Sequence, residues 1–205
     1  MHYDMKKVLI LLANGFEIYE AAAFIDILGW ATVFGSEPIE IVTAGSSERL
    51  HCTFGFDVIP DALISQLDLK SFDALAIPGG FEKAGFYNDA YSPLFSEVIK
   101  QFADSGKPIS SICVGALPIA KSGVLKGRKA TTYHLLEGRR KKELASLGAN
   151  VQDSHIVRDK NITTSSSPST AIEVAIDLLE RLTSRENADL VLDMMGFDSI
   201  KKEEV

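Results

Sequence analysis

The sequence predicts one α/β domain, in which helices cover both faces of a mainly parallel sheet. Short continuous apolar runs such as VLILL, at residues 8–12, are typical of strands that are buried on both faces. Segments with helical spacing of apolar residues lie between these runs. Strands that alternate with helices form right-handed βαβ units. The chain has 205 residues, of which 46% are hydrophobic, so one domain with a sizeable core is expected.

In the N-terminal half, turn residues separate the expected elements. The strand at 8–12 stops at Asn14-Gly15, and the run at 72–77 stops at Pro78-Gly79-Gly80. The amphipathic segment at 94–105 ends at Gly106-Lys107-Pro108, a typical helix stop. The expected elements of this half are strands at 8–12, 39–43 and 72–77, and helices at 19–33 and 94–105.

The C-terminal half continues the alternation. A strand is expected at 109–113, and a helix begins just after Gly115. Pro168 and Ser169 open an amphipathic helix that continues to Thr183. The other expected elements are strands at 128–132, 151–157 and 162–164, and helices at 135–147 and 185–195. We expect residues 1–205 to form a single domain, with a helical C-terminal extension at 184–205.

The charge and the cysteine count exclude several classes of protein. A formal net charge of −7 disfavours nucleic acid and anionic membranes as partners, and the basic stretch at 139–142 reads best as a solvated helix face. The chain has only two cysteines, and the apolar run after Met1–Lys7 is too short for a signal peptide. These features predict a cytoplasmic protein whose thiols are reduced.

Cys113 is the strongest candidate for a reactive group. Ligands of open parallel sheets bind beyond the carboxyl ends of the strands, and Cys113 follows the apolar strand at one such end. Strand, cysteine, one residue, Gly115 and then a helix is the layout of a nucleophile elbow. The following helix would favour the thiolate through its dipole. Cys113 is therefore either a reactive thiol or a buried structural cysteine. Cys52 has no comparable setting, and we interpret it as a structural cysteine.

Glutamates and glycines accompany the thiol. A buried Glu20 would stay protonated and donate a hydrogen bond to the thiolate, or act as a general acid or base. The alternative is that both Glu17 and Glu20 are first-turn glutamates whose charge stabilises the helix N-terminus. That interpretation is the better one for Glu17, whereas for Glu20 both interpretations stay open. The backbone N–H groups of Gly79, Gly80 and Val114 would form an oxyanion hole, although most Pro-Gly-Gly stretches are simple turns.

His134 is the best histidine candidate for activating the thiol, because it follows the expected strand at 128–132. The four histidines and two cysteines show no metal-ligand spacing. No glycine-rich nucleotide loop is present either, so no cofactor and no metal are expected.

These features together resemble the ThiJ/PfpI superfamily, whose fold is that of the class I glutamine amidotransferases. The resemblance extends from Lys7 to about Thr183, and its markers lie in the expected order. The nearest branch is the one typified by the human Parkinson-disease protein and the bacterial chaperone YajL. The markers are GFEIYE at 15–20 with Asp26, FDALAIPGG at 72–80, SICVG at 111–115, ATT at 130–132 and TSSSPSTA at 164–171.

The resemblance implies a flavodoxin-like three-layer sandwich and a homodimer. It implies that Cys113 pairs with a protonated Glu20, with oxyanion contacts from Gly79, Gly80 and Val114. Activities attributed to the branch include cofactor-independent glyoxalase, deglycase and peptidase or amidase activity, which act on small carbonyl or amide substrates. The branch is also linked to chaperone function and to sensing of oxidative stress through a cysteine sulfinate, without turnover.

The sequence departs from the superfamily at several positions. Val114 stands where PfpI-type peptidases have a histidine, and no late His-x-Glu is present. A gap-free reading places Tyr133 at the position of a branch histidine, with His134 one residue later. Gly29, Trp30 and Phe54 stand where the branch has arginines, so recognition of anionic ligands is expected to differ. A partner-binding dimer with a vestigial site is therefore a third hypothesis, beside the enzyme and the sensor.

Overall fold

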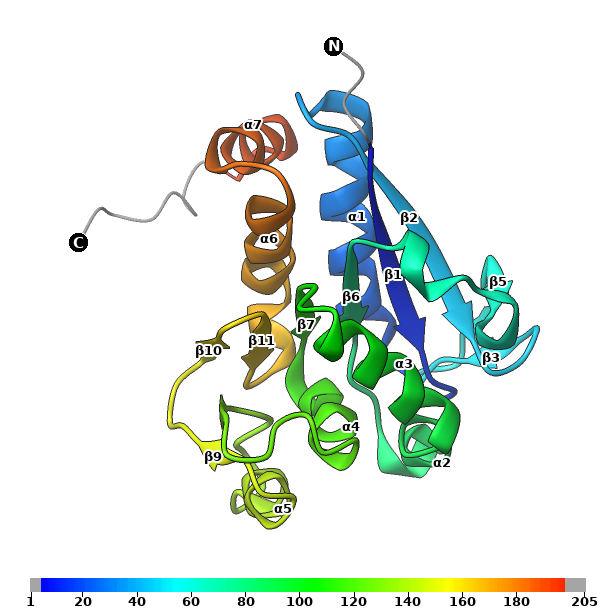
Figure 1. Ribbon diagram of the computed structural model, residues 1–205, viewed down its shortest axis with the longest axis vertical. Helices are drawn as coiled ribbons and strands as arrows, with labels where there is room; N and C mark the ends of the chain where they lie inside the picture. Colours follow the sequence, from blue (N-terminus) through cyan, green and yellow to red (C-terminus); the bar gives the residue numbers. More distant parts are fainter. Residues whose placement is uncertain (1–4, 198–205) are drawn as a thin grey trace.

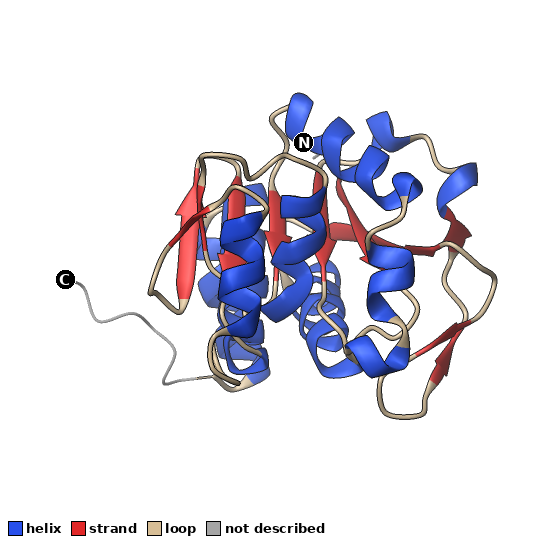
Figure 2. Ribbon diagram, turned by 90° about the horizontal axis from the view of Figure 1, so that it is seen from below, coloured by secondary structure: helices blue, strands red, loops and turns tan. Residues whose placement is uncertain are grey.

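A seven-stranded sheet lies between two layers of helices in the computed structural model, which describes residues 5–197 (Figures 1 and 2). The strand order is β10-β11-β7-β6-β1-β2-β5. The strands are β1 (Lys6–Leu12), β2 (Ile39–Gly45), β3 (Leu50–His51), β4 (Asp57–Val58), β5 (Ala62–Leu63), β6 (Ala74–Ile77), β7 (Ile109–Ser111), β8 (Lys129–Ala130), β9 (Asn150–Val151), β10 (Ile156–Asp159) and β11 (Ile162–Ser165).

Helices on the two faces of the sheet form separate groups. The α-helices α1, α6 and α7 contact one another on one face, while α2 to α5 lie on the other (Figure 1). The α-helices are α1 (Ile18–Phe34), α2 (Phe86–Ala90), α3 (Pro93–Asp104), α4 (Ala116–Lys121), α5 (Arg139–Ser146), α6 (Ala171–Leu182) and α7 (Arg185–Met195). Short 3-10 helices are η1 (Ile64–Gln66), η2 (Leu69–Ser71), η3 (Glu82–Ala84), η4 (Cys113–Gly115) and η5 (Pro168–Thr170).

The sheet is parallel except at one edge, where β10 runs antiparallel to β11. β1 pairs along its whole length with β2, from Lys6 opposite Ile39 to Leu12 opposite Gly45. The five residues of the VLILL run are all buried, as expected for a strand with helices on both faces. The predicted three-layer α/β fold is therefore confirmed, and the carboxyl ends of β1, β6 and β7 open toward the same end of the sheet.

Two predicted elements have different bounds in the structure. The helix predicted at 135–147 begins only at Arg139, because Leu136, Glu137 and Gly138 have φ values of 54°, 58° and 67°. Consecutive left-handed residues cannot continue a right-handed helix. The strand predicted at 151–157 is two strands, since a bend separates β9 from β10 and places them in different sheets.

The short elements between residues 50 and 71 carry too little pattern to be recognised in the sequence. They comprise a two-stranded sheet of β3 and β4, the edge strand β5 and two 3-10 helices. β8 was expected, but it pairs with β9 in a separate two-stranded sheet rather than with the main one.

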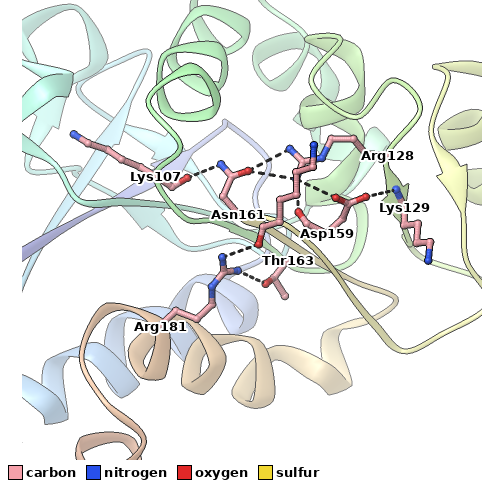
Figure 3. A network of polar contacts seen from close by, with 8 residues as sticks. Lys107, Arg128, Lys129, Asp159, Asn161, Thr163 and Arg181 are labelled. Atoms are coloured by element: carbon pink, nitrogen blue, oxygen red, sulfur yellow. Dashed lines mark hydrogen bonds and ion pairs between the residues drawn. The ribbon is translucent and has the colours of Figure 1, made fainter.

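A polar network fastens β8 to the turn between β10 and β11, at the end of the sheet away from Cys113 (Figure 3). Asn161 donates to the backbone carbonyl of Lys107 at 2.8 Å and accepts from Arg128 at 3.3 Å. The backbone N–H of Lys129 donates to Asp159 at 2.7 Å, and Arg181 donates to Thr163 at 3.0 Å. These bonds pair the charged side chains with backbone and carboxylate groups, which indicates a structural role.

The predicted C-terminal extension begins with α7, and its residues 198–205 lie outside the described part of the chain. α7 packs against α1 and α6, where Asn187 is fully buried. Among the helices of residues 5–197, none has the length and apolar character needed to cross a membrane.

Candidate active site

Cys113 occupies a strained turn between β7 and α4. Its φ of 55° lies in the left-handed region, which non-glycine residues seldom adopt, and its side chain is only 6% exposed. A Cβ at Gly115 would lie 2.5 Å from the carbonyl oxygen of Ile77, so only glycine allows the chain to pass β6 this closely. The predicted nucleophile elbow is therefore confirmed as a structural element.

Glu20 is fully buried in the first turn of α1, beside the thiol. The N–H of Gly79 donates to its Oε2 at 2.5 Å, and its Oε1 is buried without a hydrogen-bond donor among the described residues. Burial raises the pKa of Glu20 to about 8, with a further rise from the charge of Glu17. A carboxyl with this pKa is mostly protonated at neutral pH, so it can donate through Oε1 toward Glu17 or Cys113.

Glu17 precedes α1 and is closer to the site than its first-turn interpretation implies. It is half-buried, and its N–H donates to the carbonyl of Gly79 at 2.8 Å. Burial raises the pKa of Glu17, while a hydrogen bond with Glu20 opposes that rise. The two carboxyls therefore form a coupled pair on one side of Cys113.

The pKa of the Cys113 thiol was expected to be lowered by the following helix, but it is raised in the structure. Burial raises the pKa of Cys113 well above its usual value, and the negative charge of an ionised Glu20 raises it further. The N–H of Val114 donates to the sulfur and only partly opposes this rise. Since η4 and α4 together span few residues, their dipole is too weak to outweigh desolvation. The proton on sulfur needs an acceptor, and the carboxylate form of Glu20, the minor form at neutral pH, is a base that interacts with the thiol.

The glycine turn holds the carboxyl in place. A Cβ at Gly79 would lie 2.9 Å from Oε2 of Glu20 and 3.1 Å from the backbone nitrogen of Val114. The N–H of Gly79, expected as an oxyanion donor, is already engaged by Glu20. Gly80 and Val114 stay the backbone donors predicted for a substrate oxygen, although the N–H of Val114 donates to the sulfur of Cys113 in this structure.

His134 contacts a different set of residues. Its Nδ1 lies 3.4 Å from the carbonyl oxygen of Ser166, and its ring centroid is 6.1 Å from that of His155. No hydrogen bond joins His134 to Cys113 or Glu20 within the described range, so its catalytic role stays a prediction. Thr132, two residues earlier, does reach the elbow, since its hydroxyl donates to the carbonyl of Cys113 at 2.9 Å.

Two residues near the site were not recognised as candidates. The hydroxyl of Tyr87 on α2 is buried, and the guanidinium of Arg140 lies 4.6 Å from the centroid of the Tyr87 ring. Arg140 belongs to the basic stretch that was interpreted as solvated, yet only 14% of its side chain is exposed. Across residues 5–197, no three His, Cys, Asp or Glu side chains are arranged to hold a metal ion.

Comparison with known proteins decides the family, since residues 6–181 match the DJ-1/PfpI family. The chain belongs to the DJ-1/PfpI family. It is 27% identical to protein dj-1beta of Drosophila melanogaster, over 91% of this chain and 94% of that protein. The crystal structure of Drosophila DJ-1beta superposes with a TM-score of 0.82 at 28% identity, covering 93% of this chain and 97% of the other.

Relatives in the DJ-1/PfpI family bear different activities in their names. The glutathione-independent glyoxalase DJR-1.2 of Caenorhabditis elegans is 29% identical, over 91% of this chain and 94% of its own length. The putative cysteine protease YraA of Bacillus subtilis is 30% identical, over 80% of this chain and 90% of its own length. The family is therefore shown, whereas the names of these relatives point to two different reactions.

Proposed function

We propose that this DJ-1/PfpI protein is a cofactor-independent enzyme that converts small 2-oxoaldehydes to 2-hydroxy acids, with Cys113 as nucleophile and Glu20 as its proton partner. The observation that carries the proposal is the buried Glu20, whose pKa of about 8 lies near neutrality beside a strained, buried thiol. A general base works best when its pKa is close to the operating pH. The glyoxalase named among the relatives supports the same class of substrate.

The chemistry follows from the two groups. The carboxylate form of Glu20 accepts the thiol proton as the sulfur of Cys113 adds to the aldehyde carbon, and the carbonyl electron pair moves to oxygen. Transfer of a proton from the aldehyde carbon to the neighbouring carbon, assisted by a carboxylate, converts this adduct to a thioester of a 2-hydroxy acid. Water then cleaves the thioester and restores the thiol. The net reaction adds one water, so no external oxidant or reductant is required.

The test is turnover of methylglyoxal by the wild-type protein and three variants. Cys113→Ala should abolish turnover, and Glu20→Gln should reduce it strongly, because the thiol keeps its proton. Cys52→Ala should retain turnover, since Cys52 is a buried cysteine in the turn that joins β3 to β4. Equal turnover in wild type and Cys113→Ala would overturn the proposal. Turnover of an amide or a short peptide, measured in parallel, tests the alternative that the enzyme is an amidase or a peptidase.

A redox sensor is the second candidate, in which Cys113 is oxidised to a sulfinate. A protonated Glu20 supports it, because the carboxyl could donate a hydrogen bond to a sulfinate oxygen. The raised thiol pKa opposes it, since the thiolate is the form that peroxide oxidises. Mild peroxide followed by mass spectrometry should place two added oxygens on Cys113 if the sensor is correct. Preferential oxidation of Cys52 would contradict it.

We also propose that the protein forms a homodimer. The support is a set of exposed apolar side chains at the start of α1 and around the sheet of β3 and β4. Thr53 in this region is bonded to the backbone of Gly15 and Phe16, which fixes it beside α1. Sedimentation equilibrium should give the dimer mass, and a monomer at micromolar concentration would overturn this proposal. The exposed side chains are Tyr19, Phe54, Phe56 and Ile59.

A further inference from the structure

Tyr87 carries a buried hydroxyl that no other group of the described chain satisfies. Buried tyrosine hydroxyls usually have a hydrogen-bond partner, so an unpartnered one requires an explanation. Tyr91, which directly follows α2, provides the contrast, since its hydroxyl donates to Oε1 of Glu143 at 2.5 Å. The centroids of the two rings lie 4.9 Å apart. The hydroxyl of Tyr91 is therefore bonded within the protein, whereas that of its neighbour Tyr87 is not.

The position of α2 brings Tyr87 to the site. α2 begins against the glycine turn, because a Cβ at Gly80 would lie 2.5 Å from the ring of Phe86. Its other end meets the helix that follows Cys113, with the ammonium group of Lys121 lying 5.6 Å from the centroid of the Tyr91 ring. Figure 1 shows α2 and α4 at the end of the sheet where β1 and β6 terminate. Tyr87 thus lies on a helix that packs on the glycine turn at one end and meets α4, which follows the elbow of Cys113, at the other.

Electrostatic coupling agrees with this placement. Burial raises the pKa of Tyr87, and the negative charge of an ionised Cys113 adds to the rise. The cation of Arg140 opposes the rise, because a nearby positive charge favours the phenolate. The hydroxyl is therefore neutral at physiological pH, and the charges that act on its pKa include those of Arg140, Glu143 and Cys113.

Arg140 fixes the ring and polarises its hydroxyl. Its guanidinium lies 4.6 Å from the centroid of the Tyr87 ring and is held by Glu143 at 2.7 Å and by Glu82 at 2.9 Å. A planar guanidinium stacks on an aromatic face in a way that lysine does not reproduce. Glu82 belongs to η3, directly after the glycine turn, so this contact ties α5 to the same loop.

We propose that Tyr87 donates a hydrogen bond to the substrate oxygen on which negative charge develops when the sulfur of Cys113 adds to the carbonyl carbon. The inference rests on the proposed function and adds a donor to it. In this step the S–C bond forms, the carbonyl electron pair moves to the oxygen, and the thiol proton passes to Glu20. The N–H of Gly79 is not available for that oxygen, because it already bonds Glu20. A fixed side-chain donor takes its place, and Arg140 is its positioning residue.

The experiment compares Tyr87→Phe with Tyr91→Phe. Tyr87→Phe removes the hydroxyl but keeps the ring under Arg140, so kcat for methylglyoxal should fall about 10²-fold. Tyr91→Phe removes a hydroxyl that is used within the protein, so kcat should stay within about threefold of wild type. Alkylation of Cys113 by iodoacetamide should be unchanged in both variants, because that substitution develops no charge on an oxygen that Tyr87 would bind.

A second readout keeps the inference independent of turnover. Methylglyoxal that forms the reversible adduct at Cys113 protects the thiol from iodoacetamide, and Tyr87→Phe should raise the protecting concentration about tenfold. If methylglyoxal protects Cys113 of the wild-type protein from iodoacetamide but is not turned over, the proposed function is overturned. The comparison of protection in wild type and Tyr87→Phe then still tests this inference. Equal protection in wild type and Tyr87→Phe, or no protection of either, would overturn the inference.

Arg140→Lys provides a further check that leaves the hydroxyl in place. It should lower kcat several-fold alone and add little to Tyr87→Phe, since both substitutions act through the same donor. Fully additive losses in the double variant would contradict the positioning role of Arg140.

Discussion

The N–H of Gly79 donates a 2.5 Å hydrogen bond to Oε2 of Glu20, whereas no backbone N–H of the described residues donates to the other carboxyl oxygen. One bond is too little to stabilise a carboxylate that is fully buried. Burial therefore raises the pKa of this carboxyl to about 8. The glycine turn that holds the carboxyl also passes beside Val114 of the elbow. This arrangement makes the protonation of Glu20 the variable on which several measurable properties depend.

Glu20→Gln should separate thiol reactivity from turnover. Glutamine carries no charge, so above about pH 8 Cys113 ionises more readily than in wild type and iodoacetamide alkylation is faster. Glutamine also accepts no proton, so methylglyoxal turnover should fall by about 10²–10⁴-fold. The measurements are alkylation and turnover rates from pH 6 to 10. Glu173→Gln, an exposed first-turn glutamate of α6, is the matched control and should change neither.

Folding stability should decrease as the pH rises through the range set by Glu20. Its pKa in the folded state is about 8 and its reference value is 4.5, so between these values the unfolded chain binds fewer protons than the folded one. The stability contributed by the protonated group is complete below about pH 4.5 and is lost by about pH 8, at up to about 1.4 kcal/mol per pH unit. Urea denaturation at several pH values measures this slope. Glu20→Gln should flatten it, and an unchanged slope in that variant would show that other groups cause it.

Gly79→Ala should damage the site and the fold together. The added Cβ would meet Glu20 and the backbone of Val114, so we expect a loss of about 1–3 kcal/mol in the free energy of unfolding and a fall in turnover. Gly29→Ala is the control, because a Cβ there would have only Ile41 within reach, at 4.0 Å, and the residue lies inside α1. That substitution should stabilise the protein by about 0.5–1 kcal/mol. Equal effects of the two substitutions in chemical denaturation would contradict the packing argument.

The sequence is informative where a local pattern determines the structure. An apolar run, a cysteine and Gly115 suffice to predict the elbow, since each residue acts on its immediate neighbours. The place of Glu20 in the first turn after a buried strand left its role open, and its pairing with Cys113 was implied by the resemblance to the ThiJ/PfpI superfamily. The parallel sheet follows from the run at residues 8–12, which is buried throughout.

The remaining features depend on contacts between distant segments. Arg140 was interpreted as a solvated residue, because nothing in its own stretch indicates that the ring of Tyr87 lies below it. The thiol pKa was expected to fall, because a helix terminus is visible in the sequence, whereas the desolvation of Cys113 is not. The helix start at Arg139 was missed because Leu136 and Glu137 adopt left-handed backbone conformations that their residue types do not favour.

Asn187→Leu should destabilise the protein without changing the chemistry of the site. The fully buried Asn187 accepts from the N–H of Ser36 at 2.7 Å and donates to the carbonyl of Glu37 at 3.1 Å, so it joins α7 to the loop that links α1 to β2. Leucine has a similar size but leaves these backbone groups unsatisfied, which costs about 2–4 kcal/mol in the free energy of unfolding. Leu190→Ala, on a more exposed side of the same helix, should cost under about 1 kcal/mol. Urea denaturation gives both values, and the rate of Cys113 alkylation in the folded protein should match wild type. A large change in that rate would mean that α7 influences the site directly, contrary to its position on the face occupied by α1 and α6.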